Sequence, residues 1–158
     1  MQFTLVPATE SDRTYLRRLD YLADVFGDES RGRINAATSA EEYVGKWSPE
    51  HDGGIIAYDD ELVPAGGVWL RYWKPEDTYT EANLGPDIPE LAIAVENRSQ
   101  GHRLGRMLLQ AGCELAASHG ATMIALHVAP GNDRARHVYE TFGFQQSDHH
   151  PEVMTKNL

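Results

Sequence analysis

Residues 91–143 alternate between two apolar strands and two amphipathic helices, and this run constrains the fold more than any other part of the chain. Residues 91–95 and 123–128 are short apolar segments of the kind that form strands buried on both faces. The segment after each strand carries an apolar stripe with helical spacing: Leu104, Met107, Leu108, Ala111 and Leu115 after the first, and Ala135, Val138, Tyr139 and Phe142 after the second. Such a unit joins parallel strands through a right-handed crossover, so the fold is predicted to be α/β.

The remaining elements are predicted from hydrophobic periodicity and from breaker residues. They are a strand over 3–7, a helix from Thr9 to Gly27, a short helix from Ser39 to Trp47, strands over 54–58 and 63–73, a loop over 74–88, and a closing hairpin after Phe144. The sequence contains no segment typical of a linker and no internal repeat. We therefore expect one domain over residues 1–158.

Charge is distributed unevenly along the 158 residues, whose net charge is -10. Residues 1–89 hold 17 acidic and 8 basic side chains, whereas residues 90–158 hold 7 and 6. An acidic chain repels a phosphate backbone, which argues against nucleic-acid binding. The near-neutral second half suits a small anionic ligand and the acidic first half a cationic one.

The sequence shows no features of a membrane, secreted or metal-binding protein. No apolar run reaches the roughly 20 residues of a membrane span, and the first residues do not resemble a secretion signal. The lone Cys113 cannot build a zinc–thiolate cluster, and no histidine has convincing partner ligands. We therefore expect a cytoplasmic protein without a metal site.

A glycine-containing turn, residues 100–106, joins the strand ending at Val95 to the helix beginning at Leu104. The free backbone N–H groups and the dipole of a helix start make an anion site, and Arg98 and Arg106 add positive charge. The turn lacks the dinucleotide and Walker fingerprints. From these residues alone, a phosphate site and an ordinary tight turn are equally supported.

Two segments resemble signatures of the GNAT superfamily of N-acetyltransferases. In the turn, Gln100 and Gly105 match the first and last positions of Gln/Arg-x-x-Gly-x-Gly/Ala, while Arg103 replaces the middle glycine. The second signature, Asn-x-x-Ala-x-x-x-Tyr followed by Gly-Phe, is matched by Asn132, Ala135, Tyr139 and Gly143-Phe144. The signatures are about 30 residues apart, in the family's order, with a strand between them.

The resemblance implies a central mixed, splayed β-sheet flanked by helices. Residues 1–89 would form the variable acceptor-side half, 90–145 the acyl-CoA-binding core, and 146–158 the closing hairpin. Acetyl-CoA would be the acetyl donor, with its pyrophosphate on the backbone of the turn and its pantetheine arm along the strand edge. The residues thereby assigned to the cofactor are Ile93, Val95, Gln100, Gly101, His102, Arg103, Leu104, Gly105, Arg106 and Asn132.

Arg103 is the departure from the family pattern. If the turn needs a positive φ there, arginine costs about 1–2 kcal/mol relative to glycine. Alternatively, the residue is helical and its guanidinium adds a phosphate contact. Because only backbone N–H groups are strictly needed, we expect the helical conformation.

Two residues are assigned to catalysis. Tyr139 lies on an apolar stripe typical of a core residue, but by the resemblance it would protonate the departing thiolate. Glu90 begins the first strand of the core, where relatives place a carboxylate that accepts the amine proton through water. An unreactive strand-edge acid is equally supported at Glu90, and Glu96 is a weaker candidate.

The implied reaction is acetyl transfer to a primary amine by direct attack in a ternary complex. By the resemblance, the region before Glu90 borders the acceptor pocket, and its aromatic residues divide between that pocket and the core: Trp69, Tyr72, Trp73 and Tyr79. With nearby acids, this cluster suits a cationic or aromatic amine. A non-catalytic acyl-CoA-binding regulatory module remains the alternative. Acetylation of a protein N-terminus or lysine, O-acetylation and a homodimer also remain open.

Overall fold

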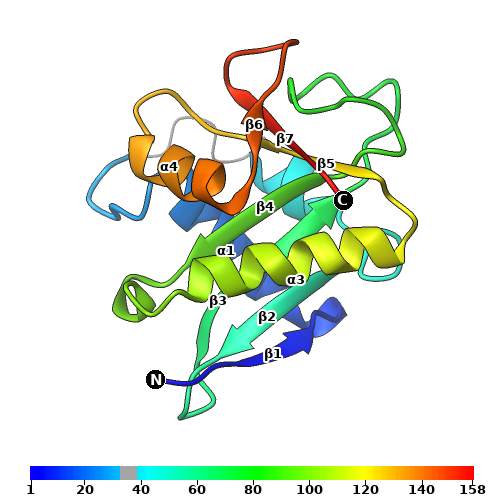
Figure 1. The fold of residues 1–158 in the computed structure, drawn as a ribbon. Coiled ribbons are helices and arrows are strands. Elements are labelled where there is room, and N and C mark those ends of the chain that lie inside the picture. The colour runs from blue at the N-terminus through cyan, green and yellow to red at the C-terminus, as the bar shows by residue number, and fades with distance from the viewer. Residues whose placement is uncertain (33–38) are drawn as a thin grey trace.

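The computed structural model describes residues 1–32 and 39–158, which form a seven-stranded sheet with helices on both faces (Figure 1). The strands are β1 (Thr4–Pro7), β2 (Gly54–Tyr58), β3 (Pro64–Arg71), β4 (Glu90–Val95), β5 (Met123–His127), β6 (Gln145–Gln146) and β7 (Val153–Asn157). The helices are α1 (Arg13–Asp24), α3 (Leu104–Ser118) and α4 (Asp133–Phe142), with short helical turns η1 (Glu10–Asp12), η2 (Glu41–Gly45) and η3 (Asn97–Ser99).

The strand order is β1-β2-β3-β4-β5-β7-β6. Within the described ranges, β4 and β5 are the one parallel pair, and the other neighbours are antiparallel. The sheet is therefore mixed, and α3 supplies the crossover between its two parallel strands. This confirms the predicted α/β fold and the parallel pairing of the two apolar strands.

Helices cover both faces of this sheet. In Figure 1, α3 and α4 lie in front of it and α1 lies behind it. The buried residues of α3 pack against those of the front face: Leu104, Leu108 and Leu109 with Val68, Leu70 and Leu91. Those of α1 pack against the other face: Leu16, Leu19 and Leu22 with Ile56 and Trp69. The apolar sides of α3 and α1 thus form the two core-facing helix surfaces.

The strands β4 and β5 pair only at their beginnings. Glu90 lies opposite Ala125 in the one register pair between them, and the Ala125 N–H donates to the carbonyl of Pro89 at 2.9 Å. The Glu96 N–H donates toward β3, to the carbonyl of Ala65 at 2.8 Å. Because backbone groups alternate sides along a strand, those of Ile93 and Val95 point into the opening beside β5.

This opening also changes the burial of β4. Its first two residues, Glu90 and Leu91, are buried, whereas the following four are half-buried. The prediction that residues 91–95 are buried on both faces is therefore wrong. The side chains of Ile93 and Val95 pack partly against the core under α3, and both residues also line a cavity.

The segment around η2 differs from its prediction. The predicted short helix from Ser39 to Trp47 is present in part: residues 39–40 are α-helical, and residues 41–45 continue as a π-helical turn. The Ser39 hydroxyl donates to the carboxylate of Asp20 on α1 at 3.0 Å. The closing hairpin is present as β6 and β7. None of the helices in the described ranges is long and apolar enough to cross a membrane.

Candidate active site

A cavity of about 610 Å³ occupies the opening between β4 and β5. Its walls include Leu91–Val95 of β4, residues 126–129 at the end of β5, and the side of α4 that carries Tyr139. It also extends to residues of α1 and η2 on the opposite face of the sheet. One continuous space therefore reaches both faces of the sheet at the point where its strands separate.

The turn before α3 presents free backbone donors. We find no hydrogen bond donated by the N–H groups of residues 101–106 to any described residue, and the first donor of the helix is Met107, to Arg103 at 3.1 Å. A Cβ added at Gly101 or Gly105 would meet nothing within 4 Å, so open space lies over both residues. Unpaired donors at a helix N-terminus beside open space fit the phosphates of a CoA molecule.

The conformation predicted for Arg103 is wrong. This residue precedes α3 with φ 62° and ψ 18°, which is left-handed and not helical. The physical reason is that the turn must reverse direction between Gly101, at φ 83°, and the first helical residue. The side chain is therefore carried at a backbone position that suits glycine better.

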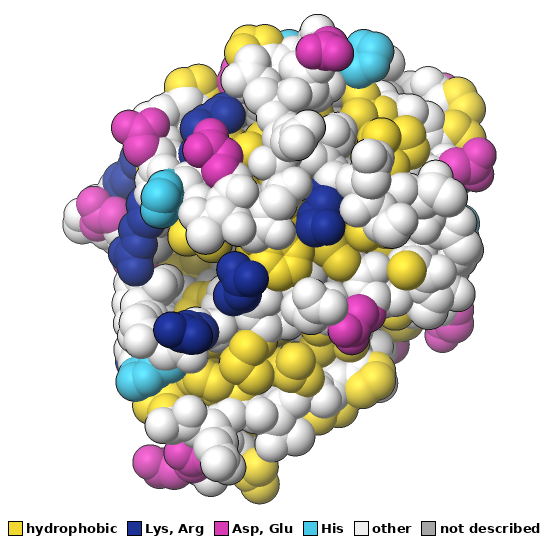
Figure 2. All heavy atoms as spheres, in the orientation of Figure 1, with side chains coloured by type: hydrophobic (Ala, Val, Ile, Leu, Met, Phe, Trp, Pro, Cys, Tyr) yellow, Lys and Arg dark blue, Asp and Glu magenta, His cyan; other side chains and the backbone are white. Residues whose placement is uncertain are grey.

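Basic side chains surround a second hollow of about 310 Å³ beside this turn. Arg103 and Arg106 line it from the turn and α3, and Arg134 lines it from α4. Figure 2 shows Lys and Arg side chains on the left of the molecule, where both helices begin. Anions are favoured here by the cationic side chains and by two helix dipoles.

Gln100 joins the two sides of this hollow. Its side-chain oxygen accepts a hydrogen bond from Arg134 at 3.1 Å, and its amide donates to the Val95 carbonyl at 3.4 Å. Sequence analysis assigned Gln100 to the cofactor but did not single out Arg134, which lies two positions after Asn132. Arg134 therefore joins the set of candidate phosphate contacts.

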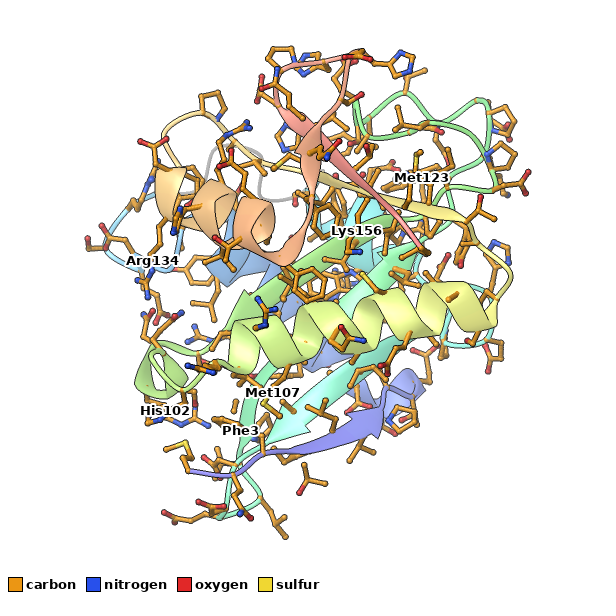
Figure 3. The ribbon with its side chains drawn as sticks, viewed as in Figure 1. Phe3, His102, Met107, Met123, Arg134 and Lys156 are labelled. Atoms are coloured by element: carbon orange, nitrogen blue, oxygen red, sulfur yellow. The ribbon has the colours of Figure 1, made fainter. Side chains whose placement is uncertain are left out.

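Other predicted cofactor residues have different surroundings. The His102 ring packs edge-on against Phe3, with centroids 6.5 Å apart, and both lie below the start of α3 in Figure 3. His102 is exposed, and its ring contacts Phe3 beside the turn. Leu104 is buried, and the Arg106 guanidinium lies 5.4 Å from the centre of the Phe142 ring.

Tyr139 lines the main cavity from α4 and is half-buried. Its ring packs edge-on against Phe144 at 6.1 Å, and burial raises the pKa of its phenol to about 12. The hydroxyl therefore carries its proton at neutral pH and can donate a hydrogen bond to a group in the cavity. Asn132 lines the same cavity just before α4 begins, so the structure brings Asn132 and Tyr139 of the second signature to one space.

Glu90 lines the cavity from the start of β4 and is 2% exposed. Its Oε2 accepts a hydrogen bond from the Tyr43 hydroxyl at 2.7 Å, and its Oε1 accepts one from Trp73 Nε1 at 2.9 Å. Burial raises the pKa of Glu90 to about 7, and these hydrogen bonds oppose the rise. A carboxyl that titrates near neutrality is suited to accepting a proton.

Three other sequence candidates do not line the cavity: Glu96, Tyr72 and Trp73. Trp73 was predicted to border the acceptor pocket and is instead a core residue, with 1% of its surface exposed. Glu96 accepts hydrogen bonds from Tyr15 at 2.8 Å and Arg18 at 3.0 Å, which makes it part of a structural ion pair. Tyr72 hydrogen-bonds His119 Nδ1 at 3.0 Å and does not line the cavity. The prediction that Tyr72 borders the acceptor pocket is therefore wrong, because its side chain points to the α3 side of the sheet.

The end of the cavity near Glu90 is acidic and aromatic. Asp20 and Asp24 line it from α1, and Glu81 lines it from the loop before β4. Tyr79 and Trp69 add aromatic surface. Among the described residues, no group of three or more His, Cys, Asp or Glu side chains is arranged to hold a metal ion.

Comparison with known proteins gives one consistent match. The family model described as "Acetyltransferase (GNAT) family" matches residues 19–144. A relative from Rhodococcus erythropolis named mycothiol acetyltransferase is 29% identical over 119 residues, which cover 63% of this chain and 39% of the relative. The chain therefore spans about two fifths of the length of that curated relative.

Solved structures share the fold at low sequence identity. A GNAT-family acetyltransferase from Staphylococcus aureus aligns with a TM-score of 0.74 at 12% identity, covering 99% of each chain. A putative acetyltransferase from Salmonella typhimurium, solved with its cofactor acetyl-CoA, aligns with a TM-score of 0.69 at 15% identity, covering 100% of this chain and 95% of the other.

Proposed function

Because the chain belongs to the acetyltransferase (GNAT) family, we propose that it transfers an acetyl group from acetyl-CoA to the primary amine of a small cationic acceptor. The observation that carries this proposal is the single cavity between β4 and β5, which Tyr139 lines from one face of the sheet and Glu90 from the other. Residues 90–145 hold the donor, and residues 1–89 supply most of the acceptor side.

The donor site is built from residues that fit CoA. The N–H groups of residues 101–106 hold the pyrophosphate, with Arg103, Arg106 and Arg134 around it. The backbone groups of Ile93 and Val95 pair with the pantetheine arm along the open strand edge. Bound acetyl-CoA supplies an activated thioester carbon.

Two protons move in the reaction. Glu90 accepts a proton from the attacking amine, directly or through a water molecule, while the new carbon–nitrogen bond forms. Tyr139 gives its phenolic proton to the thiolate as the carbon–sulfur bond breaks. The products are an amide and free CoA, and attack takes place in a ternary complex without a covalent enzyme intermediate.

The acceptor preference follows from charge. Asp20, Asp24 and Glu81 line the acceptor end with the aromatic rings of Trp69 and Tyr79. Carboxylates and ring faces both attract cations. The curated relative is named mycothiol acetyltransferase, but the chain spans only part of that relative. A mycothiol-related amine is therefore one of the acceptors to be tested.

The test is the release of free CoA from acetyl-CoA by the purified chain. A diamine, a neutral primary amine of equal length and a mycothiol-related amine are compared with a reaction lacking acceptor. We expect release that depends on acceptor and is fastest for the diamine. Binding of acetyl-CoA without release for any amine would instead indicate the regulatory binding module.

A further inference from the structure

The carboxylate of Glu90 is held at both oxygens, and the two donors differ in position. Trp73 Nε1 donates to Oε1 at 2.9 Å from a side chain that is 1% exposed and does not line the cavity. The Tyr43 hydroxyl donates to Oε2 at 2.7 Å, and Tyr43 does line the cavity. Tyr43 is therefore a partner of Glu90 on the cavity side, from which an acceptor arrives.

The position of Tyr43 is fixed from several directions. Its ring makes edge contacts with Trp73 at 5.4 Å and Tyr79 at 5.8 Å. The π-helical turn that carries it is anchored to β3 through the Tyr43 carbonyl, which accepts a hydrogen bond from Trp69 Nε1 at 3.0 Å. Arg71 Nε similarly donates to the Glu42 carbonyl at 2.9 Å. A hydroxyl held in this way has little freedom to leave Glu90.

We propose that Tyr43 is a positioning residue for acetyl transfer: its hydroxyl orients the Glu90 carboxylate and stabilises its ionised form. This inference rests on the proposed function, in which Glu90 accepts the amine proton. A donated O–H bond stabilises the charged carboxylate and not the neutral acid. Without this hydrogen bond, less counteracts the effect of burial, so the pKa of Glu90 rises.

The other charged and titratable groups around Glu90 set the background for this effect. The charge of Arg71 on β3 and a hydrogen bond from Thr80 favour the ionised form. Across the same cavity lie the acidic side chains of α1 and the loop before β4, and His127 of β5. Those acids disfavour a second negative charge, and burial lowers the pKa of His127, which favours its neutral form. Groups that favour the ionised form of Glu90 and groups that disfavour it are thus both present, so loss of the Tyr43 hydrogen bond is expected to change the pKa of Glu90 measurably.

The test is the pH dependence of kcat/KM for wild type and Tyr43→Phe with the same amine. The acidic limb of the variant is expected to move up by about 1 pH unit, the size of one charge-assisted hydrogen bond. At pH values below the limb, kcat/KM of the variant is then about tenfold lower than that of wild type. At high pH the two values differ little, because Glu90 is ionised in both proteins. The KM for acetyl-CoA stays the same.

The matched control is Tyr72→Phe, which removes a hydroxyl outside the cavity and is expected to leave the limb in place. Thermal unfolding of each variant checks the fold. If Tyr43→Phe is unstable, Tyr43→Met provides a second donor-free side chain of flexible shape. A uniform loss at every pH, or an unmoved limb, would overturn the role of Tyr43.

A measurement without acceptor separates this inference from the proposed function. The carboxyl carbon resonance of Glu90, assigned with Glu90→Gln, is followed against pH in wild type and Tyr43→Phe. A raised midpoint in the variant supports the hydrogen-bond role whether or not an acceptor is known. If the midpoint moves but Glu90→Gln retains full activity, Glu90 is not the base and the positioning role fails with it. An equal midpoint in both proteins overturns the inference alone.

Discussion

The backbone at Arg103 adopts a conformation that costs arginine more than glycine. Its φ of 62° is left-handed, and a Cβ in this conformation raises the energy by about 1–2 kcal/mol relative to glycine. Glycine in turn loses more chain entropy on folding, which costs about 0.5–1 kcal/mol. Arg103→Gly should therefore raise the free energy of unfolding by up to about 1 kcal/mol, measured by urea denaturation.

The side chain of Arg103 has an opposite effect on ligand binding. Both Arg103→Gly and Arg103→Ala remove a guanidinium beside the phosphate turn and should raise the Kd of acetyl-CoA several-fold in calorimetry. Arg103→Ala keeps the Cβ and should bring no gain in stability. Equal unfolding free energies for the two variants would contradict the strain at this residue.

Tyr139 carries the assignment of the general acid. Tyr139→Phe keeps the ring contact with Phe144 and removes only the hydroxyl, so kcat should fall by roughly 10–100-fold. The Kd of acetyl-CoA should change little, because the phenol acts on sulfur at the moment of cleavage. Steady-state kinetics and calorimetry measure the two quantities, and an unchanged kcat would remove Tyr139 from the mechanism.

Sequence reasoning placed Glu90 in a candidate site but did not find Tyr43. The two residues are 47 positions apart, and their hydrogen bond depends on a π-helical turn that no hydrophobic period indicates. Tyr72 shows the opposite error: it was predicted to border the acceptor pocket, and its side chain lies elsewhere. Clustering along the sequence could not distinguish it from Tyr79, because only the direction of the strand end sends Tyr72 toward His119.

The elements of the second half were predicted well, for a physical reason. Helices α3 and α4 have clear apolar stripes ending at a glycine, and most of the α3 stripe packs on one face of the sheet together with Tyr139 and Phe142 of α4. Met107 and Val138 of the same stripes are exposed. The splay between β4 and β5 leaves no trace in hydrophobicity, since Ile93 and Val95 are as apolar as residues of a closed sheet. Only the family resemblance pointed to it.

Helix α3 lies close to the sheet because Gly112 has no side chain. A Cβ there would stand 2.8 Å from Leu91 Cδ1 and 2.9 Å from Val68 Cγ2. Gly112→Ala should therefore destabilise the protein by about 1–3 kcal/mol through overpacking, even though alanine is the better helix former.

The matched control lies on the same helix. A Cβ at Gly105 would meet nothing within 4 Å, so Gly105→Ala should be neutral or stabilising by up to about 1 kcal/mol in the free protein. Urea denaturation of both variants measures the difference. If Gly112→Ala were as stable as Gly105→Ala, the close approach of α3 to β3 and β4 would not limit packing.

At the scale of the whole molecule, donor binding should stabilise the fold. Acetyl-CoA at 100 times its Kd adds about 2.7 kcal/mol, which corresponds to a rise in Tm of about 5–10 °C for a chain of this size. NAD and ATP serve as controls, because the turn lacks both of their fingerprints. A similar rise with all three would show a general phosphate site and not a CoA site.

The unpaired edge of β4 has a consequence for how the protein meets other chains. Free strand edges recruit strands from neighbouring molecules, and proteins usually shield them. Here the free edge lies in the middle of the strand order, facing β5, with α1 on one face of the sheet and α3 and α4 on the other. A second polypeptide would have to enter between these helices to add a strand there. The backbone hydrogen-bonding groups of β4 therefore stay available to a slender ligand and are shielded from strands of neighbouring molecules.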